Sequence, residues 1–383
     1  MELYVHLPFC VRKCRYCDFA SFPGLEGSVE AYVDAVLREA ELRRNECPEP
    51  FDTVYFGGGT PSLIPPAALA RLIRGLKERL DLASVREWTS EANPGTVTKE
   101  WLDTALEGGV NRVSLGMQAA QRSLLSMLGR IHCPEDTERS VKAARDAGFR
   151  NLSLDLMFGL PGQTADDWTE TLEAALALNP EHLSAYGLIP EEGTPLYEDL
   201  RSGKMSLPEP EEEREMYGAL LRTAEAAGFR QYEISNFALP GFECLHNAGY
   251  WRQVPYLGLG LSAASMTEVR KGPDGMRYVR RTNVRTPEEY MRGILSGTPA
   301  LAEKAETAPE EARFETMMLG LRMNRGVGER EFSAMHGVSL EACFGERLRA
   351  LRGRGLVLYE NGFWRLTRDG MDLQNTVLVE LMD

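Results

Sequence analysis

Three cysteines near the start of the chain have the spacing of an iron-sulfur ligand set. Cys10, Cys14 and Cys17 follow the pattern Cys-x3-Cys-x2-Cys, directly after a short run typical of a β-strand. In a loop at a strand end, three thiolates this close can each bind one iron of a 4Fe-4S cubane cluster. The fourth iron then stays open, and the amino and carboxylate groups of S-adenosylmethionine can chelate it. One electron from the cluster could cleave a C-S bond of that cofactor and give a 5'-deoxyadenosyl radical.

A structural zinc site is the alternative interpretation of these cysteines. His6 or Asp18 would then serve as the fourth ligand. Structural zinc usually takes its cysteines from two separated pairs, and no second pair occurs later in the sequence. Cys47 and Cys133 each precede a proline, an arrangement that is sometimes associated with heme regulation. Two Cys-Pro pairs in a chain with 21 prolines are weak evidence for such regulation. We expect the remaining four to be core or surface thiols: Cys47, Cys133, Cys244 and Cys343.

A glycine turn, Gly57-Gly58-Gly59-Thr60-Pro61, follows the second predicted strand. Because these glycines lack side chains, their backbone amides can approach the polar groups of a ligand closely. A glycine run by itself is only a tight turn. Because this glycine run lies one βα unit after the cysteine loop, we interpret it as the place that holds the methionyl amino group of the cofactor.

Polar residues recur at the ends of later predicted strands. Glu91 and Gln118 end two of them, and Arg130 lies in a following turn. A lone residue of this kind is more often a helix cap or a surface charge. Asp155 is less ordinary, because leucines at 152, 154 and 156 surround it and a buried carboxylate needs partners.

Short β-rich runs alternate with longer helical patterns in the first half of the chain, which predicts an α/β fold with a parallel sheet. Six βα units could close as an incomplete (β/α)6 TIM-like barrel that binds ligands at the carboxyl ends of its strands. The expected strands are Leu3 to Leu7, Thr53 to Phe56, Glu87 to Ala92, Arg112 to Met117, Asn151 to Met157 and His182 to Leu188. The expected helices are Val29 to Arg44, Ala67 to Leu80, Lys99 to Glu107, Pro134 to Ala147 and Ala165 to Leu178.

The pattern changes near Thr307. Three helical segments and a hairpin that turns at Glu360-Asn361-Gly362 predict a smaller winged-helix-like domain. The segments are Glu311 to Leu321, Glu329 to His336, Leu340 to Arg352 and the hairpin Leu356 to Leu366. We therefore expect three parts: a barrel over 1–235, a connecting segment over 236–306 and the C-terminal domain over 307–383.

The charge balance argues against nucleic acid as a partner. Lys and Arg number 43 against 57 Asp and Glu, which gives a formal net charge of -14. We therefore interpret the winged-helix-like domain as a lid or a partner-binding module. The sequence has neither a leader of signal-peptide type nor an apolar run of about 18 residues. A cytoplasmic protein with reduced thiols is expected.

These residues together resemble the radical SAM superfamily and, within it, the oxygen-independent coproporphyrinogen III oxidase group. The resemblance rests on Tyr4 to Cys10, Gly57 to Pro61, Gln118, Leu128 to Arg130 and Asp155 to Gly162. It implies that the matching positions bind S-adenosylmethionine: Tyr4, Tyr16, Gly58, Gly59, Thr60, Glu91, Gln118, Arg130 and Asp155.

Two departures set the chain apart from the oxidases. Phe19 stands where their pattern has a further cysteine, and the first strand begins almost at Met1, without their N-terminal extension. The segment from His246 to Trp251 is instead similar to the His-Asn-x-x-Tyr-Trp motif of the heme chaperones named HemW. Since imidazole can ligate heme iron and aromatic rings can stack on a porphyrin, this resemblance implies heme contacts, with the axial ligand left open. The implied residues are His246, Asn247, Tyr250 and Trp251.

The resemblance implies a heme chaperone that uses a 4Fe-4S cluster and S-adenosylmethionine and delivers heme to acceptor proteins. Respiratory acceptors, some at the membrane, an electron donor to the cluster and a homodimer are further expectations. Two other function classes remain open. One is a working radical enzyme, such as coproporphyrinogen III oxidase. The other is an interaction module in which the cluster is only structural.

Overall fold

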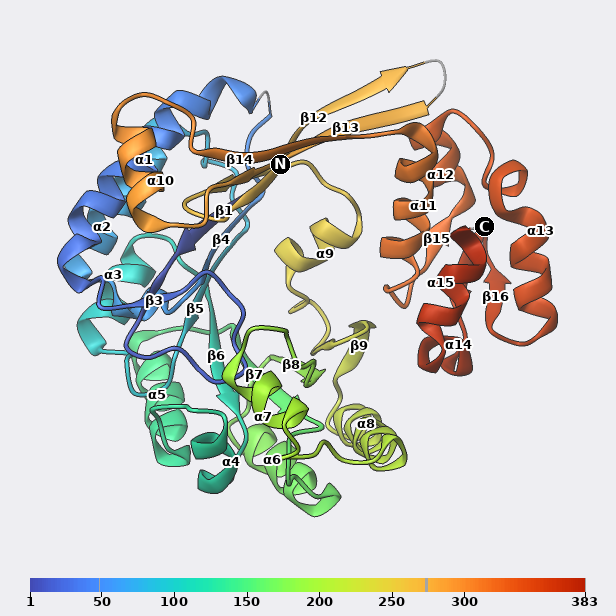
Figure 1. Cartoon of the computed structure of the whole chain (residues 1–383), viewed down its shortest axis with the longest axis horizontal. Coiled ribbons are helices and arrows are strands. Elements are labelled where there is room, and N and C mark those ends of the chain that lie inside the picture. Colours follow the sequence, from blue (N-terminus) through green and yellow to red (C-terminus); the bar gives the residue numbers. More distant parts are fainter. Residues whose placement is uncertain (48, 273–274, 383) are drawn as a thin grey trace.

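The computed structural model describes residues 1–47, 49–272 and 275–382 of the chain (Figure 1). Six neighbouring parallel strands form the centre of its largest sheet, as the sequence predicts. They are β1 (Glu2–Leu7), β4 (Thr53–Gly58), β5 (Glu87–Ala92), β6 (Arg112–Gln118), β7 (Leu152–Phe158) and β8 (His182–Gly187).

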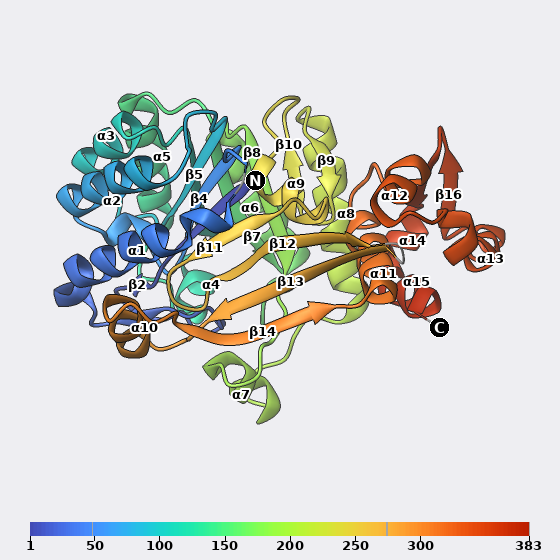
Figure 2. The same cartoon turned by 90° about the horizontal axis from the view of Figure 1, so that it is seen from above.

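Helices follow these strands and cover the outer face of the curved sheet (Figures 1 and 2). Each connection returns the chain to the next parallel strand, as a βαβ unit requires. Gly148, at φ +112°, ends one helix in the left-handed conformation that glycine adopts readily. The five expected helices are all present: α1 (Val29–Arg43), α2 (Pro66–Arg79), α3 (Lys99–Glu107), α5 (Pro134–Ala147) and α6 (Ala165–Ala177).

The sheet extends beyond the six expected strands at both edges. β11 (Tyr256–Leu259) pairs in parallel with β1, and β12 (Ala264–Gly272), β13 (Gly275–Asn283) and β14 (Leu301–Thr307) continue the sheet in antiparallel fashion. At the other edge, β10 (Asn236–Ala238) and β9 (Arg230–Glu233) follow β8. Because β14 and β9 are the two ends of the strand order, the described sheet is an open, incomplete barrel.

The C-terminal part has a hydrophobic core of its own, which includes Phe332, Leu348 and Trp364. Figure 1 shows it beside the open edge of the sheet. The expected helices and hairpin are present, and the hairpin turns at Asn361 and Gly362, both at positive φ. Its elements are α11 (Pro309–Gly320), β15 (Val327–Gly328), α12 (Glu329–His336), α13 (Leu340–Gly353), β16 (Val357–Glu360), β17 (Phe363–Leu366), α14 (Arg368–Asp372) and α15 (Gln374–Met382).

The remaining elements are short pieces at the strand ends or connections between the larger parts. No helix in the described ranges is both long and apolar enough to cross a membrane. These elements are β2 (Phe9–Cys10), β3 (Phe22–Pro23), α4 (Arg122–Met127), α7 (Pro195–Arg201), α8 (Pro210–Ala226), α9 (Leu245–Trp251) and α10 (Pro287–Leu295).

Candidate functional site

A cavity of about 320 Å³ lies at the carboxyl ends of the parallel strands. It will be called the cofactor cavity. The strands bring residues together here that are distant in the sequence, which is how barrel-type folds build ligand sites. Most of the predicted site residues line it: Cys10, Cys14, Cys17, Tyr16, Gly58, Gly59, Glu91, Gln118, Arg130, Asp155 and Asn247.

The cysteine loop is held against the turn that carries Arg130. The backbone N–H of Arg15 donates to Leu128 O at 2.9 Å, and the Arg12 guanidinium donates to Gly129 O at 2.9 Å. Arg130 in turn reaches the Cys14 Sγ at 3.7 Å. Burial raises the pKa of the Cys10 and Cys17 thiols. Binding of metal to these cysteines would therefore release protons.

The structure fits a cluster at these cysteines better than the zinc alternative. Both ring nitrogens of His6 are engaged, Nδ1 with Tyr4 OH at 3.0 Å and Nε2 with Ala20 O at 2.8 Å. Asp18 pairs with Arg285 at 3.2 Å. In the described part of the chain, no three His, Cys, Asp or Glu side chains are placed to hold one metal ion. A single zinc, with ligands at about 2.3 Å, would thus need the loop to rearrange, whereas a cubane spreads its thiolates over three irons.

The glycine turn after β4 packs so closely that side chains are excluded. A Cβ atom on Gly58, whose φ is +112°, would lie 2.5 Å from the His6 ring. A Cβ on Gly59 would lie 2.6 Å from Phe9 O. The backbone N–H of Gly58 donates to Glu91 Oε2 at 3.2 Å. The turn therefore packs tightly against His6 and Phe9 and lies beside a carboxylate that lines the cavity.

Two half-buried carboxyl groups line the cofactor cavity. Glu91 accepts a hydrogen bond from Tyr55 OH at 2.9 Å, and burial, reinforced by the nearby Asp155, raises its pKa to about 7. Asp155 accepts a hydrogen bond from Ser114 Oγ at 3.0 Å, and burial raises its pKa as well. A positively charged ligand would favour the ionised form of both groups. S-adenosylmethionine, which carries an ammonium and a sulfonium group, meets that requirement.

Gln118 and Arg130 are held by specific backbone geometry. Gln118 has a φ of +66°, an uncommon conformation for a residue with a side chain, where β6 and β7 shift register. Tyr186 OH donates to Gln118 Oε1 at 3.2 Å. Arg130 donates to Asn93 Oδ1 at 2.6 Å and to Gly116 O at 2.8 Å. Both polar groups are thereby fixed at the cavity wall.

Several residues of this wall were not predicted. Asn93 lies two residues after Glu91, so the alternation of side chains along a strand could have indicated it. The others lie on neighbouring strands, and their place at the cavity depends on the register of the sheet, which no local pattern contains. They include Tyr55, Asn93, Ser114, Ser184 and Tyr186.

A second cavity, of about 440 Å³, adjoins the first and will be called the aromatic cavity. The two share Tyr55, Glu91 and Asn247 as lining residues. The helix α9 supplies most of its predicted residues and packs against β4. Its lining is Tyr4, Tyr55, Glu91, His246, Asn247, Tyr250, Tyr256 and Ala264.

Three predicted site residues lie differently from the rest. Tyr4 lines the aromatic cavity and is absent from the described lining of the cofactor cavity. Thr60 is buried behind Cys10, with its Oγ1 3.6 Å from the Cys10 Sγ. Trp251 lines neither cavity and lies beneath the Arg322 guanidinium of the C-terminal part, 5.4 Å from its ring centroid.

His246 is enclosed by hydrogen bonds and aromatic rings. Its Nδ1 lies 2.8 Å from Thr53 Oγ1 and its Nε2 lies 3.0 Å from Tyr250 OH. The side chain is 1% exposed. Burial, with a smaller contribution from the positive charge of Arg112, lowers its pKa to about 3. The imidazole is therefore neutral at physiological pH.

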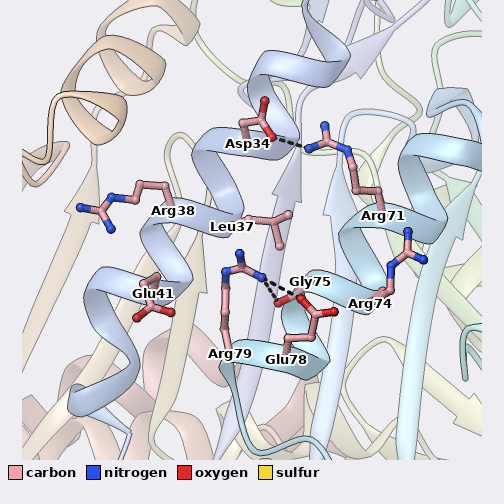
Figure 3. A pocket seen from close by; sticks show the side chains of 9 residues that line it. All are labelled: Asp34, Leu37, Arg38, Glu41, Arg71, Arg74, Gly75, Glu78 and Arg79. Atoms are coloured by element: carbon pink, nitrogen blue, oxygen red, sulfur yellow. Dashed lines mark hydrogen bonds and ion pairs between the residues drawn. The ribbon is translucent and has the colours of Figure 1, made fainter.

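A third groove, of about 460 Å³, lies between α1 and α2 on the outer face of the sheet (Figure 3). It contains none of the predicted site residues. Arg71 pairs with Asp34, and Arg79 pairs with Glu78 at 3.4 Å and donates to Gly75 O at 2.8 Å. Because Arg71 and Arg79 are paired with Asp34 and Glu78, and none of the predicted site residues lies here, we interpret the groove as a solvated, charged surface.

Two family models match the chain. The model described as the radical SAM superfamily matches residues 4–175, and the HemN C-terminal domain matches residues 308–373. The first match spans the cysteine loop, the glycine turn and Asp155. The second spans the winged-helix-like part.

Curated relatives match the chain over nearly its full length. The heme chaperone HemW of Bacillus subtilis is 37% identical over 98% of this chain and 97% of its own length. The heme chaperone HemW of Escherichia coli is 35% identical over 99% of this chain and 97% of its own. Among solved structures, the coproporphyrinogen III oxidase HemN of Escherichia coli superposes with a TM-score of 0.83, at 22% identity, over 99% of this chain and 89% of that one. The likeness to HemN shows the fold of this chain.

Proposed function

Since the chain belongs to the radical SAM superfamily and, within it, to the HemW family, we propose that it is a heme chaperone that binds heme and delivers it to acceptor proteins. One observation carries this proposal beyond the family relationship. The cavity lined by the three cysteines and the cavity lined by His246, Asn247 and Tyr250 share Tyr55, Glu91 and Asn247. Occupancy of one cavity can therefore affect the other through residues that line both.

The cofactor cavity is the proposed site of the 4Fe-4S cluster and S-adenosylmethionine that the family implies. Cys10, Cys14 and Cys17 would hold the cluster. The cofactor would supply a cation and, on reduction by the cluster, radical chemistry. The chain's own residues would orient it through the carboxylates of Glu91 and Asp155 and through the close approach that the glycine turn allows. For that role we propose Tyr4, Tyr16, Gly58, Gly59, Thr60, Glu91, Gln118, Arg130 and Asp155.

The aromatic cavity is the proposed heme site. His246, Asn247 and Tyr250 face it from α9, and the tyrosine rings give it apolar walls with hydroxyl groups at their edges. Trp251 lies at the far end of the same helix against the C-terminal part. We propose that it transmits the position of α9 to that part of the molecule.

Coproporphyrinogen III oxidase activity is the competing function, and one residue argues against it. Phe19 occupies the position of the further cysteine in the oxidase pattern, and its side chain is 67% exposed at the rim of the cofactor cavity. A phenyl ring cannot bind metal as a thiolate does. We therefore propose that the protein is not a coproporphyrinogen oxidase.

The remaining features of the proposal concern organisation and partners. We divide the chain into the barrel over 1–235, the connecting segment over 236–306 and the C-terminal domain over 307–383. The separate hydrophobic cluster and the HemN C-terminal match at 308–373 support the last boundary. We propose respiratory acceptors at the membrane, an electron donor to the cluster, a homodimer and a cytoplasmic location, where thiols stay reduced.

The test is heme transfer by anaerobically reconstituted protein. The protein would be loaded with iron, sulfide, S-adenosylmethionine and heme, then mixed with membranes that contain heme-free respiratory cytochromes. We expect heme to appear in the cytochromes, measured as the pyridine hemochrome of washed membranes. In a parallel reaction with coproporphyrinogen III, we expect no catalytic formation of protoporphyrinogen. Catalytic turnover there, without transfer, would replace the chaperone function by the oxidase function.

A pair of cysteine variants links transfer to the cluster. Cys14→Ser removes one proposed cluster ligand, whereas Cys343→Ser changes a cysteine on α13 in the C-terminal part. We expect the first to lose cluster iron, S-adenosylmethionine binding and heme transfer, and the second to retain all three. Recovery of about one zinc per chain without iron or sulfide would favour the zinc site instead.

A further inference from the structure

We propose that the aromatic cavity recognises the porphyrin macrocycle by stacking on tyrosine rings and not through an iron bond to His246, so that it takes metal-free porphyrins as well as heme. This inference rests on the proposed function and names the ligand class of its heme site. It makes His246 a positioning residue, whose task is to hold the rings around it.

The surroundings of His246 leave its nitrogens committed to the protein. Nδ1 contacts Thr53 Oγ1 at 2.8 Å and Nε2 contacts Tyr250 OH at 3.0 Å, so each nitrogen has a partner. The ring also stacks on Tyr55 at 5.1 Å with an interplanar angle of 27°, and the edge of Tyr250 meets it at 4.8 Å and 82°. An iron atom could reach Nε2 only after the Tyr250 hydroxyl and the covering rings had moved away.

The rings around His246 form a wall suited to a flat ligand. Tyr4 and Tyr55 stack at 6.3 Å with an interplanar angle of 28°. Tyr250 and Tyr256 meet edge to face at 4.9 Å and 88°. All four side chains are half-buried and line the cavity, so each presents part of its ring to the space. Porphyrin faces bind such rings by apolar contact and offset stacking, neither of which needs the metal.

The hydrogen bonds explain why a histidine would be used here without ligating iron. A neutral imidazole can donate with one nitrogen and accept with the other, so it joins Thr53 on β4 to Tyr250 on α9. This link fixes the orientation of the Tyr250 ring while the stack fixes that of Tyr55. The wall is thereby preorganised, which reduces the entropy lost when a rigid ligand binds.

The experiment compares heme with metal-free protoporphyrin IX on the full chain reconstituted with its cluster. Both would be titrated under anaerobic conditions, heme by its Soret absorbance and protoporphyrin by fluorescence anisotropy, and each would be used to displace the other. We expect the two dissociation constants to agree within about tenfold, one order of magnitude in affinity, and the displacement to be complete. Heme binding at least a hundredfold tighter, or failure to compete, would overturn the inference and leave the chaperone function in place.

Variants at Tyr250 and His246 separate stacking from ligation. Tyr250→Phe keeps the ring but frees His246 Nε2. Iron ligation predicts a selective gain in heme affinity and a shifted Soret band, whereas stacking predicts an unchanged ratio of the two affinities. His246→Ala should weaken both porphyrins by a similar factor. A loss confined to heme would identify His246 as the iron ligand and overturn the inference.

Two controls support the interpretation of these titrations. Tyr197→Ala, on α7 and outside the lining of both cavities, should leave both titrations unchanged. If His246→Ala does not fold, Tyr250→Phe alone still decides between the two modes. Binding of neither porphyrin to the parent protein would instead overturn the proposed function, and the inference with it.

Discussion

At the scale of single residues, Gly58 is where the packing of the cofactor cavity is most restrictive. Its φ of +112° excludes most side chains, and a Cβ atom at this position would lie only 2.5 Å from the His6 ring. We predict that Gly58→Ala displaces the turn because of this clash, breaks the 3.2 Å hydrogen bond to Glu91 and weakens S-adenosylmethionine binding about tenfold or more, which corresponds to about 1.4 kcal/mol. Calorimetry on the cluster-loaded protein would measure the affinity for S-adenosylmethionine.

Gly24 offers the matched control for that change. It also has a left-handed φ, +82°, but no atom lies within 4 Å of its Cβ position. Gly24→Ala therefore carries the same kind of backbone strain without the clash, and it should lower stability while leaving cofactor affinity unchanged. Equal losses of affinity in both variants would show that strain in general, and not the fit of the turn, governs binding.

The residues that could be predicted from the sequence were those whose types are unusual for their position. Asp155 was recognisable because it interrupts a run of leucines, and the structure gives it the partner that a buried carboxylate needs, Ser114. Tyr55 and Tyr186 were not recognisable, because a tyrosine in a strand is ordinary. Their importance arises from the register that aligns them with Glu91 and Gln118, which no local pattern contains.

At the scale of elements, α9 depends on a carboxylate from another strand. Glu87, on β5, accepts from Leu245 N at 2.9 Å and from His246 N at 3.1 Å, so it serves the free N–H groups at the start of the helix. We predict that Glu87→Ala loosens α9 by about 2 kcal/mol or more, the value of a buried charge-assisted hydrogen bond. Amide exchange over residues 245–251, measured by mass spectrometry, should accelerate about 30-fold.

An exposed carboxylate provides the comparison for Glu87. Glu78→Ala removes one member of the ion pair in the groove between α1 and α2 (Figure 3), where surface pairs contribute little. We expect this variant to leave the exchange of α9 unchanged. Unaltered protection of α9 in Glu87→Ala would mean that packing against β4, and not the capping carboxylate, holds the helix.

The shortest elements that escaped prediction, unlike the longer strands β12, β13 and β14, share a physical cause. The six central strands are apolar runs between amphipathic helices, so local periodicity indicates them. In contrast, β11 has four residues with a glycine among them, and β9 and β10 have four and three. Strands this short are stabilised by their neighbours in the sheet rather than by their own sequence. The Leu245–Trp251 helix is likewise too short to form without the tertiary contacts that cap it.

At the scale of the whole molecule, the hydrophobic cores of the sheet and of the C-terminal part are joined at several places in the described part of the chain. Strand β14 leads from the sheet into α11, and the neighbouring strand β13 runs antiparallel to it, as Figure 2 shows. A second contact forms where the segment after α11 meets β9. Asn324 Nδ2 donates to Gln231 O at 2.6 Å, Asn324 N donates to Tyr232 O at 3.1 Å, and Met323 pairs with Glu233. The second contact lies next to Trp251 on α9, through Arg322. It therefore connects the C-terminal part to the helix of the aromatic cavity.

This second junction can be weakened without touching either core. Asn324→Asp replaces the amide donor by a carboxylate that faces the Gln231 carbonyl oxygen and lies near the buried Glu233, so a hydrogen bond is lost and like charges meet. We predict a cost of about 1–3 kcal/mol, the penalty for leaving a buried polar group unpaired. The loss of stability should appear as faster amide exchange in β9 and residues 322–326, with the exchange of α13 unchanged.

Asn361→Asp provides the control, because it makes the same chemical change in an exposed turn. The φ of +51° at this position is one that aspartate also tolerates, so the variant should alter the exchange of neither region. If β9 keeps its protection in Asn324→Asp, the C-terminal part is held by its other contacts, such as those of Glu315 with Arg280 on β13 and of Thr316 with Gln253, and a route from it to α9 through Arg322 loses its support.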